Sequence, residues 1–576
     1  MLKITKENFK KREFVFSENL IVPGIAGHTA PVAHIKDVSN GVATAEWYFV
    51  SRYFDLIDDN KAVATVNELK KLQITDENNY FYGCVRWYRE EEFISDSNGA
   101  FFVLRPLALA YKLCYDKMTA CEKETIKEML EKSIKWFVKE TTATNFSTIH
   151  YSNKIMSDGA MLSLINSICR SCAEECHNFW NKWNEYVDRR GYGWGENTSD
   201  CYSSIMLAAL NMVIISSDDV EVLKIAEEKR KNLLSYIIFH EGKEFVPSVR
   251  TYNFSGSITY GGGIYKFLYR DCNNTSDKSN VNMSALNNIL LFEANTNKLE
   301  LSRENTRCER IFDDSFAYTW KGKNIRLGTV TKFPAMQGCY QRDGWGLGWQ
   351  SMPVSVMIED AQVLFMRIRT RVNGKERSHP AVNKHDAYLY GRLFEDGNRV
   401  VFNTVSKQEK NIAVVVRSAN LIANTAEAIY DEWCIPKGAG EICEFDINNR
   451  KWFVVMYPEN AVALCPLDGI NALEPNRQKS VSIVGESGSF NVISTELYKG
   501  ENKLLFSPRI ESAWAVVALE SSDNIEEYLK TITIEDDNIF NLENPEESCM
   551  CKRKIVCTDE EIKVELAVNP YYDLFF

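Results

Sequence analysis

The segment EKETIKEMLEKSIKWFVKE, residues 122–140, sets the pattern for the first half of the chain. Its apolar residues, from Ile126 to Phe137, fall on one stripe at helical spacing, and Glu and Lys fill the other positions, as in an amphipathic helix. Similar helical segments occupy residues 101–117, 159–172, 202–215 and 220–239. Successive helices with short loops and no fixed repeat length predict hairpins packed into a bundle or toroid.

The periodicity changes after about residue 300. Short β-rich runs separated by turn residues occupy 324–333, 362–372, 399–405, 411–419, 452–458, 480–485, 504–507 and 513–520. Because no long helices intervene, the strands are expected to form antiparallel, sandwich-like sheets. The sequence therefore predicts two domains, a helical domain over 1–300 and an antiparallel β-sandwich domain over 301–576.

Length and composition agree with a large globular protein of at least two domains, with 576 residues of which 45% are hydrophobic. A net charge of −12 without a basic stripe argues against nucleic-acid binding. The chain has no run of 18 apolar residues and no apolar leader, so we expect no membrane partner and a cytoplasmic location, with its 16 Cys reduced. The oligomeric state is left open.

Two segments of the helical half carry candidate site residues. His150 and Asn153 precede an apolar helix, where Asn153 could equally be a helix cap. In GYGWGENTSDCY (191–202), Ser199 and Asp200 are good N-caps for the next helix. The remaining side chains are more polar and aromatic than capping needs, and we take Trp194, Glu196, Asn197 and Tyr202 as candidates.

Three further loops could contribute to the same site. Tyr252 and Tyr260 flank the run Gly261-Gly262-Gly263, which permits close approach of a ligand but is equally typical of a turn. A basic loop between two strands carries Arg377, His379 and His385. Trp345, in a Gly-Trp loop, could stack on a sugar ring or pack between domains.

The cysteines offer weaker candidates for metal binding. Cys169, Cys172 and Cys176 have ligand-like spacing, but on one helix they would share a face and act as small core residues. Cys549, Cys551 and Cys557 are judged in the same way.

Taken together, the site segments resemble the heparinase II/III-like polysaccharide lyases and the related toroid alginate lyases. Those proteins have an Asn-His pair opening a helix, then a Gly-x-x-x-Glu-x-Ser-x-x-Tyr loop, and later a His-Asp stretch on a strand. Here Asn153, Glu196, Tyr202 and His385-Asp386 resemble these pieces, and Lys154 stands where the family has His. The resemblance implies an (α/α) toroid followed by a β-sandwich.

The resemblance also implies β-elimination on an acidic oligo- or polysaccharide. Removing the C5 proton of a uronate requires neutralisation of its carboxylate, for which Asn153 with His379 or His385 are the candidates. Tyr202 is the expected base and acid, and Tyr260 is the second candidate. Trp194, Glu196, Asn197, Tyr252, Arg377 and Trp345 would bind substrate. No cofactor is required, although the His-Asp piece leaves room for a structural zinc or calcium ion.

Two other functions fit the same features. A glycoside hydrolase on a helical toroid needs two carboxylates facing a bond, and Glu196 and Asp200 are present. A non-catalytic glycan-binding protein could use the same cleft. The identity of the glycan and endo or exo action are not determined by the sequence.

Overall fold

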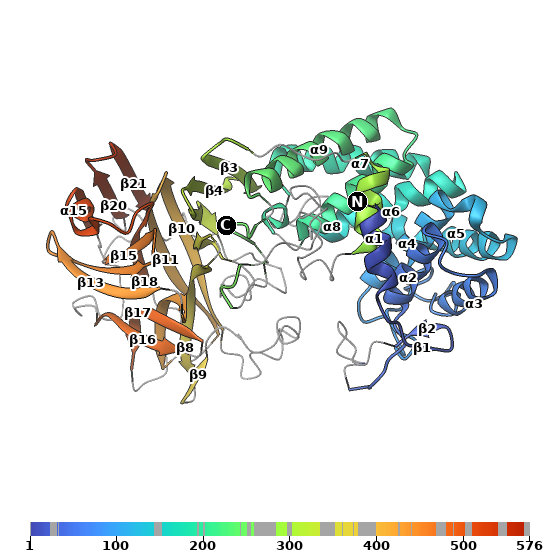
Figure 1. Ribbon diagram of the computed structural model, residues 1–576, viewed down its shortest axis with the longest axis horizontal. Coiled ribbons are helices and arrows are strands. Elements are labelled where there is room, and N and C mark those ends of the chain that lie inside the picture. Colours follow the sequence, from blue (N-terminus) through green and yellow to red (C-terminus); the bar gives the residue numbers. More distant parts are fainter. Residues whose placement is uncertain are drawn as a thin grey trace. The chain divides into compact units, whose positions relative to one another are not determined.

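The computed structural model divides into two compact units (Figure 1). It describes residues 2–22, 32, 34–142, 152–192, 195–199, 202–241, 243–249, 251, 255–258, 284–295, 302–333, 352–359, 361–372, 374–377, 399–423, 427–438, 440–467, 480–487, 489–500, 510–539 and 550–568. The helical unit comprises Met1–Asn197, Cys201–Gly242 and Tyr260–Ser302, and the β unit comprises Thr198–Asp200, Lys243–Thr259 and Arg303–Phe576. None of the helices in the described ranges combines the length and the apolar character that a membrane crossing would need.

The helical unit is built from helical hairpins. Its helices are α1 (Leu2–Lys10), α2 (Gly41–Tyr53), α3 (Asp59–Lys70), α4 (Asn98–Leu113), α5 (Ala120–Thr142), α6 (Ser152–Cys169), α7 (Ala173–Arg190), α8 (Tyr202–Ser216), α9 (Val220–Phe239) and α11 (Ala285–Glu293). Short 3₁₀ turns η2 (Tyr115–Lys117) and η3 (Glu196–Thr198) and the hairpin β1 (Phe16–Ser17) and β2 (Leu20–Ile21) join them.

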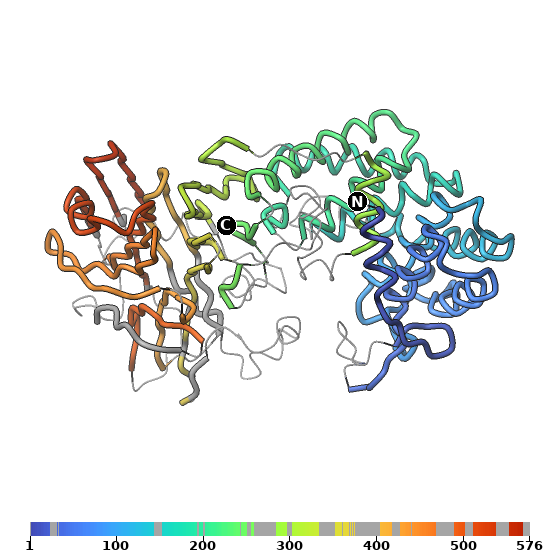
Figure 2. Tube along the Cα trace, viewed as in Figure 1, coloured from blue at the N-terminus to red at the C-terminus, as the bar shows by residue number. Residues whose placement is uncertain are grey.

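Alternate helices form an inner layer of this unit. The helices α2, α4, α6 and α8 pack on one another in that order, and α11 packs on both α8 and α2. The helices α3, α5, α7 and α9 pack in a second succession outside them. Figure 2 traces this order along the chain from the blue α2 to the yellow-green α11. The inner helices α6 and α8 are buried over most of their surface, as expected of the inner layer of an (α/α) toroid.

A buried ion pair fastens the first inner helix to the longest outer one. Glu122 lies in the first turn of α5 and forms a capping box with Thr119, whose backbone N–H donates to the Glu122 carboxylate over 2.8 Å. The same carboxylate accepts from Tyr48 Oη at 2.7 Å and from Arg52 Nη2 at 2.7 Å, both on α2. Glu122 and Arg52 are both buried, so neither charge is compensated by water.

The described residues of the β unit form three antiparallel sheets. Its strands are β3 (Thr306–Phe312), β4 (Ser315–Gly322), β5 (Ile325–Val330), β6 (Lys332–Phe333), β7 (Val354–Ile358), β8 (Gln362–Val372), β9 (Lys375–Arg377), β10 (Arg399–Glu409), β11 (Ile412–Ala423), β12 (Ala428–Pro436), β13 (Glu441–Ile447), β14 (Arg450–Met456), β15 (Ala461–Leu467), β16 (Ser480–Ser487), β17 (Phe490–Lys499), β18 (Ile510–Leu519), β19 (Ile532–Ile539), β20 (Met550–Cys557) and β21 (Ile562–Val568), with helix α15 (Ile525–Lys530).

Strand order defines the layers. A seven-stranded sheet runs β13-β14-β15-β18-β11-β10-β6, and a nine-stranded sheet runs β16-β17-β12-β8-β7-β5-β4-β3 with β9 beside β8. A three-stranded sheet runs β19-β20-β21. Register along each described pair is antiparallel, for example Val415 opposite Trp514 in β11 and β18. The helical half followed by antiparallel sheets confirms the fold class expected from the sequence.

The seven-stranded sheet is buried on both faces. On β18, Trp514 and Val516 pack into a core shared with the nine-stranded sheet. The alternate residues Ala515 and Val517 pack into a second core shared with α15 and the three-stranded sheet. Because side chains alternate across a strand, double burial explains the continuous apolar run of 513–519.

Element bounds match the sequence-based prediction best where the periodicity is strongest. The helix expected at 220–239 is α9, and the strand expected at 362–372 is β8, each with unchanged bounds. The helix expected at 159–172 instead ends at Cys169, because Arg170 adopts a left-handed backbone with φ of 58°. The strand expected at 504–507 lies outside the described residues.

The Glu122 contacts generate a stability prediction. Glu122→Ala would leave the buried Arg52 guanidinium without its main counter-charge, so we expect it to lower the free energy of unfolding by about 3–5 kcal/mol. Urea unfolding followed by circular dichroism measures this value. Glu131→Ala on the same helix, where the exposed Glu131 lies 3.7 Å from Lys127, is the control and is expected to cost about 0.5 kcal/mol or less. Equal losses for the two variants would contradict this role for Glu122.

Candidate functional site

Two segments that the sequence singled out meet at the start of α6 and α8. Asn153 is the second residue of α6, and Glu196 lies in η3, directly before α8. The Glu196 carboxylate accepts the Asn153 backbone N–H at 2.7 Å and the Asn153 Nδ2 amide at 2.8 Å to each oxygen. Ser152 Oγ also donates to the carbonyl of Tyr192, within the same two segments. The bonds hold the two inner helices together at their N-terminal ends.

Glu196 therefore caps the N-terminus of α6, a role that the sequence allowed for Asn153. The first N–H groups of a helix have no intrahelical acceptor, and a carboxylate is favoured there by the helix dipole. Asn153 lies inside the helix rather than at its cap, so its side chain is oriented by Glu196. Glu196 is 0% exposed and Asn197 is buried beside it.

Tyr202 is the first residue of α8, as the sequence predicted for the helix start. Its side chain is 7% exposed. Since α6 and α8 pack on one another and Glu196 joins their starts, Asn153 and Tyr202 belong to neighbouring N-terminal turns of the inner layer. This arrangement offers an amide donor and a phenol from adjacent helices.

The residue after Asn153 takes part in a partly buried ion cluster. Lys154 Nζ lies 2.8 Å from Glu140 and 2.6 Å from Asp158, and its side chain is 23% exposed. Burial disfavours the ammonium, but the two carboxylates outweigh this and raise the pKa of Lys154 above its ordinary value. Burial raises the pKa of Asp158 to about 6, against the opposing effect of Lys154. Lys154 thus stays charged, and the carboxylates of Glu140 and Asp158 neutralise its charge.

The buried cation Arg105 was not anticipated from the sequence. Arg105, on the inner helix α4, lies over the rings of Phe101 and Phe102, with centroid distances of 4.9 and 5.6 Å. Burial lowers the pKa of Arg105 to about 10, and Glu46 partly offsets this. Its Nε has no hydrogen-bond partner among the described residues. No sequence motif marks Arg105, because its environment depends on the packing of α2 against α4.

Six of the remaining candidates lie outside the described residues. They are His385, Tyr260, Trp194, Tyr252, His379 and Trp345. Arg377 ends strand β9 of the β unit, and only its backbone is described. Their contribution to a shared site remains a prediction.

Three cysteines with ligand-like spacing, Cys169, Cys172 and Cys176, are among the described residues. Cys169 ends α6 and Cys176 lies on α7, so with Cys172 between the helices the three do not share one helical face as expected. Burial raises the pKa of Cys172 to about 12 and that of Cys176 to about 11, which favours the neutral thiols. Within the described ranges, no three His, Cys, Asp or Glu side chains are grouped to hold a metal ion.

Comparison with known proteins gives only a remote likeness. No model of a protein family matches the chain, and no curated protein matches it either. Among solved structures, endoglucanase CelQ from Clostridium thermocellum complexed with cellotriose is 10% identical, covering 85% of this chain and 86% of that chain at a TM-score of 0.23. Its complex with cellotetraose is 9% identical over the same shares, at a TM-score of 0.22. At these scores the likeness carries no argument about this chain.

The Lys154 cluster generates a pH-dependent prediction. Lys154→Met removes the charge that opposes protonation of Asp158, so the pKa of Asp158 in the folded state should rise further above its unfolded value. A carboxyl with a raised folded pKa loses stability as pH rises through that window. We therefore expect Lys154→Met to lower the unfolding free energy by about 3–5 kcal/mol at about pH 8 and by less at about pH 5.

Urea unfolding at the two pH values measures the difference, with Lys127→Met, an exposed position on α5, as the control. If the loss of unfolding free energy does not change with pH, the proposed interaction between Lys154 and Asp158 is contradicted.

Proposed function

We propose that this chain is a glycan lyase that cleaves a uronic-acid-containing oligo- or polysaccharide by β-elimination at the start of α6 and α8. One observation carries the proposal. Glu196 binds both the backbone and the side chain of Asn153, so the two segments that resemble the lyase motif meet in the fold. The resemblance rests on sequence positions 43 residues apart, and by itself it does not require Asn153 and Glu196 to be in contact.

Asn153 would neutralise the uronate carboxylate. Its Nδ2 is equidistant from the two Glu196 oxygens, a geometry in which one amide hydrogen is shared between them. The second amide hydrogen is then available to a substrate oxygen. A donor fixed before the reaction stabilises the enediolate without reorganising as charge develops.

Tyr202 would transfer the protons. As a phenolate it removes the C5 proton of the uronate, the C4–O bond breaks, and a double bond forms between C4 and C5. The resulting phenol then returns its proton to the departing glycosidic oxygen. Because an ordinary Tyr has a pKa near about 10, the phenolate requires nearby positive charge.

Glu196 is better suited to positioning than to acid catalysis. Both of its oxygens already accept hydrogen bonds from Asn153, and its side chain is fully buried. A glycosidase acid must present a proton to the leaving oxygen, and a partner carboxylate must face it. Hydrolysis through Glu196 is therefore disfavoured, and the experiment below distinguishes it.

The reaction class is tested by product chemistry. Incubation with alginate, polygalacturonate, hyaluronan and heparan sulfate, followed by ultraviolet absorbance, should reveal an unsaturated uronate with at least one glycan. New reducing ends without this chromophore would indicate a hydrolase instead. Absence of both products with every uronate glycan would leave a glycan-binding role and contradict the proposal.

Two substitutions test the assigned residues on whichever glycan is cleaved. Tyr202→Phe keeps the ring and should lower kcat by about 10²–10⁴-fold, the usual scale for one positioned proton-transfer group. Asn153→Ala should lower it by about 10²–10³-fold, as for loss of one oxyanion donor. Tyr115→Phe, at an exposed position of the same unit, is the control and should retain full activity. Full activity of Tyr202→Phe would remove Tyr202 from the mechanism and favour Tyr260.

A further inference from the structure

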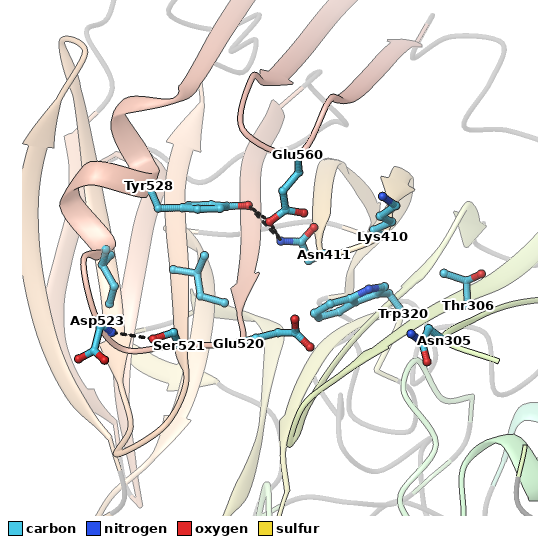
Figure 3. A pocket seen from close by; sticks show the side chains of 12 residues that line it. Asn305, Thr306, Trp320, Lys410, Asn411, Glu520, Ser521, Asp523, Tyr528 and Glu560 are labelled. Carbon is cyan, nitrogen blue, oxygen red and sulfur yellow. Dashed lines mark hydrogen bonds between the residues drawn. The ribbon is translucent and has the colours of Figure 1, made fainter. Parts of the chain in front are cut away.

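The β unit contains a cavity of about 620 Å³ that belongs to none of the residues considered above. It lies where the three sheets of this unit come together (Figure 3). Trp320 comes from β4 of the nine-stranded sheet, and Asn411 directly precedes β11 of the seven-stranded sheet. Tyr528 lies on α15, and Glu560 lies in the turn between β20 and β21. This volume is in the range of small-molecule sites.

One wall of the cavity carries an unpaired buried acceptor. Tyr528 Oη donates to Glu560 Oε1 over 2.7 Å, and Asn411 Nδ2 donates to Tyr528 Oη over 3.2 Å. Asn411 is 4% exposed, and its Oδ1 has no hydrogen-bond partner in the described part of the chain. Leaving such a group unsatisfied costs about 1–3 kcal/mol, so a ligand donor that reached Asn411 Oδ1 would remove that cost.

The other walls are aromatic and acidic. In Figure 3, Trp320 and Tyr528 lie on opposite sides of the cavity, and Glu520 and Glu560 lie between them. Trp320 is 8% exposed and is held by the core behind it. The lining has three carboxylates, those of Glu520, Asp523 and Glu560, and one amine, that of Lys410. An anionic ligand would therefore be repelled.

We propose that this cavity binds a sugar residue that carries no negative charge. A sugar hydroxyl both donates and accepts, so one hydroxyl can donate to Asn411 Oδ1 while its neighbour donates to Glu560. The apolar C–H face of a pyranose packs on an indole, which Trp320 supplies. The cavity thus differs in ligand charge from the α6–α8 site, whose proposed substrate is a uronate, and gives the chain a second glycan-binding site.

Binding is tested on the intact chain by calorimetric titration with cellobiose, lactose and maltose, and with digalacturonate as the anionic comparison. At least one neutral disaccharide should bind, with a Kd of about 1 mM or tighter, and digalacturonate should compete poorly with it. Asn411→Ala should weaken binding by about 10-fold or more, and Tyr528→Phe, which keeps the ring, should weaken it measurably. Glu527→Gln, exposed on the same α15 helix, is the control and should bind as the wild type does.

Asn153→Ala and Tyr202→Phe should leave this binding unchanged, which separates it from the proposed lyase activity. The proposal is overturned if no neutral disaccharide binds, if Asn411→Ala and Tyr528→Phe both bind as tightly as the control, or if digalacturonate displaces the neutral sugar with equal affinity.

Discussion

The bonds between Glu196 and Asn153 are the constraint on which the candidate site depends. One buried carboxylate satisfies the first turn of α6, orients the Asn153 amide and fixes the turn that leads into α8. These three effects follow from a single side chain because the carboxylate has two oxygens and accepts several hydrogen bonds. Without it, the side chain and the backbone N–H of Asn153 would lose their shared acceptor, and only the packing of α6 on α8 would relate Asn153 to Tyr202. The proposed proton transfer requires both residues to stay in place.

Several buried or partly buried charges of the helical unit are offset by specific partners. Glu122 joins α2 to α5 through Arg52, and Lys154 joins α6 to Glu140 at the end of α5. Removing one partner of such a pair is costly, so these contacts specify which helix surfaces meet. Arg105 is the exception, since its guanidinium is buried over aromatic rings instead.

The predictability of each part follows from how its residues are packed. Helix α9 and strand β8 have regular apolar periodicity and were predicted with their full bounds. Strand β12 was missed because it carries Asp431 and Glu432 in its centre, and both are fully buried against Arg417 and Arg367. Charged residues inside a strand interrupt the apolar pattern from which a strand is predicted. Asn153, Glu196 and Tyr202 were found through their resemblance to a motif, but the bonds between the first two depend on how α6 packs against α8. The cavity near Asn411 could not be predicted at all, since its walls come from separate strands and turns.

The most direct test of this account is a double-mutant cycle between Asn153 and Glu196, measured as the free energy of unfolding in urea. Asn153→Ala removes only the side-chain bond, because the backbone N–H still reaches Glu196, whereas Glu196→Ala removes both. The cycle therefore isolates the amide–carboxylate contact. The account predicts a coupling energy of about 1.5–3 kcal/mol, the range for a hydrogen bond to a charged group. Additive losses, within about 0.3 kcal/mol, would show that Glu196 does not hold Asn153 and would contradict the central claim.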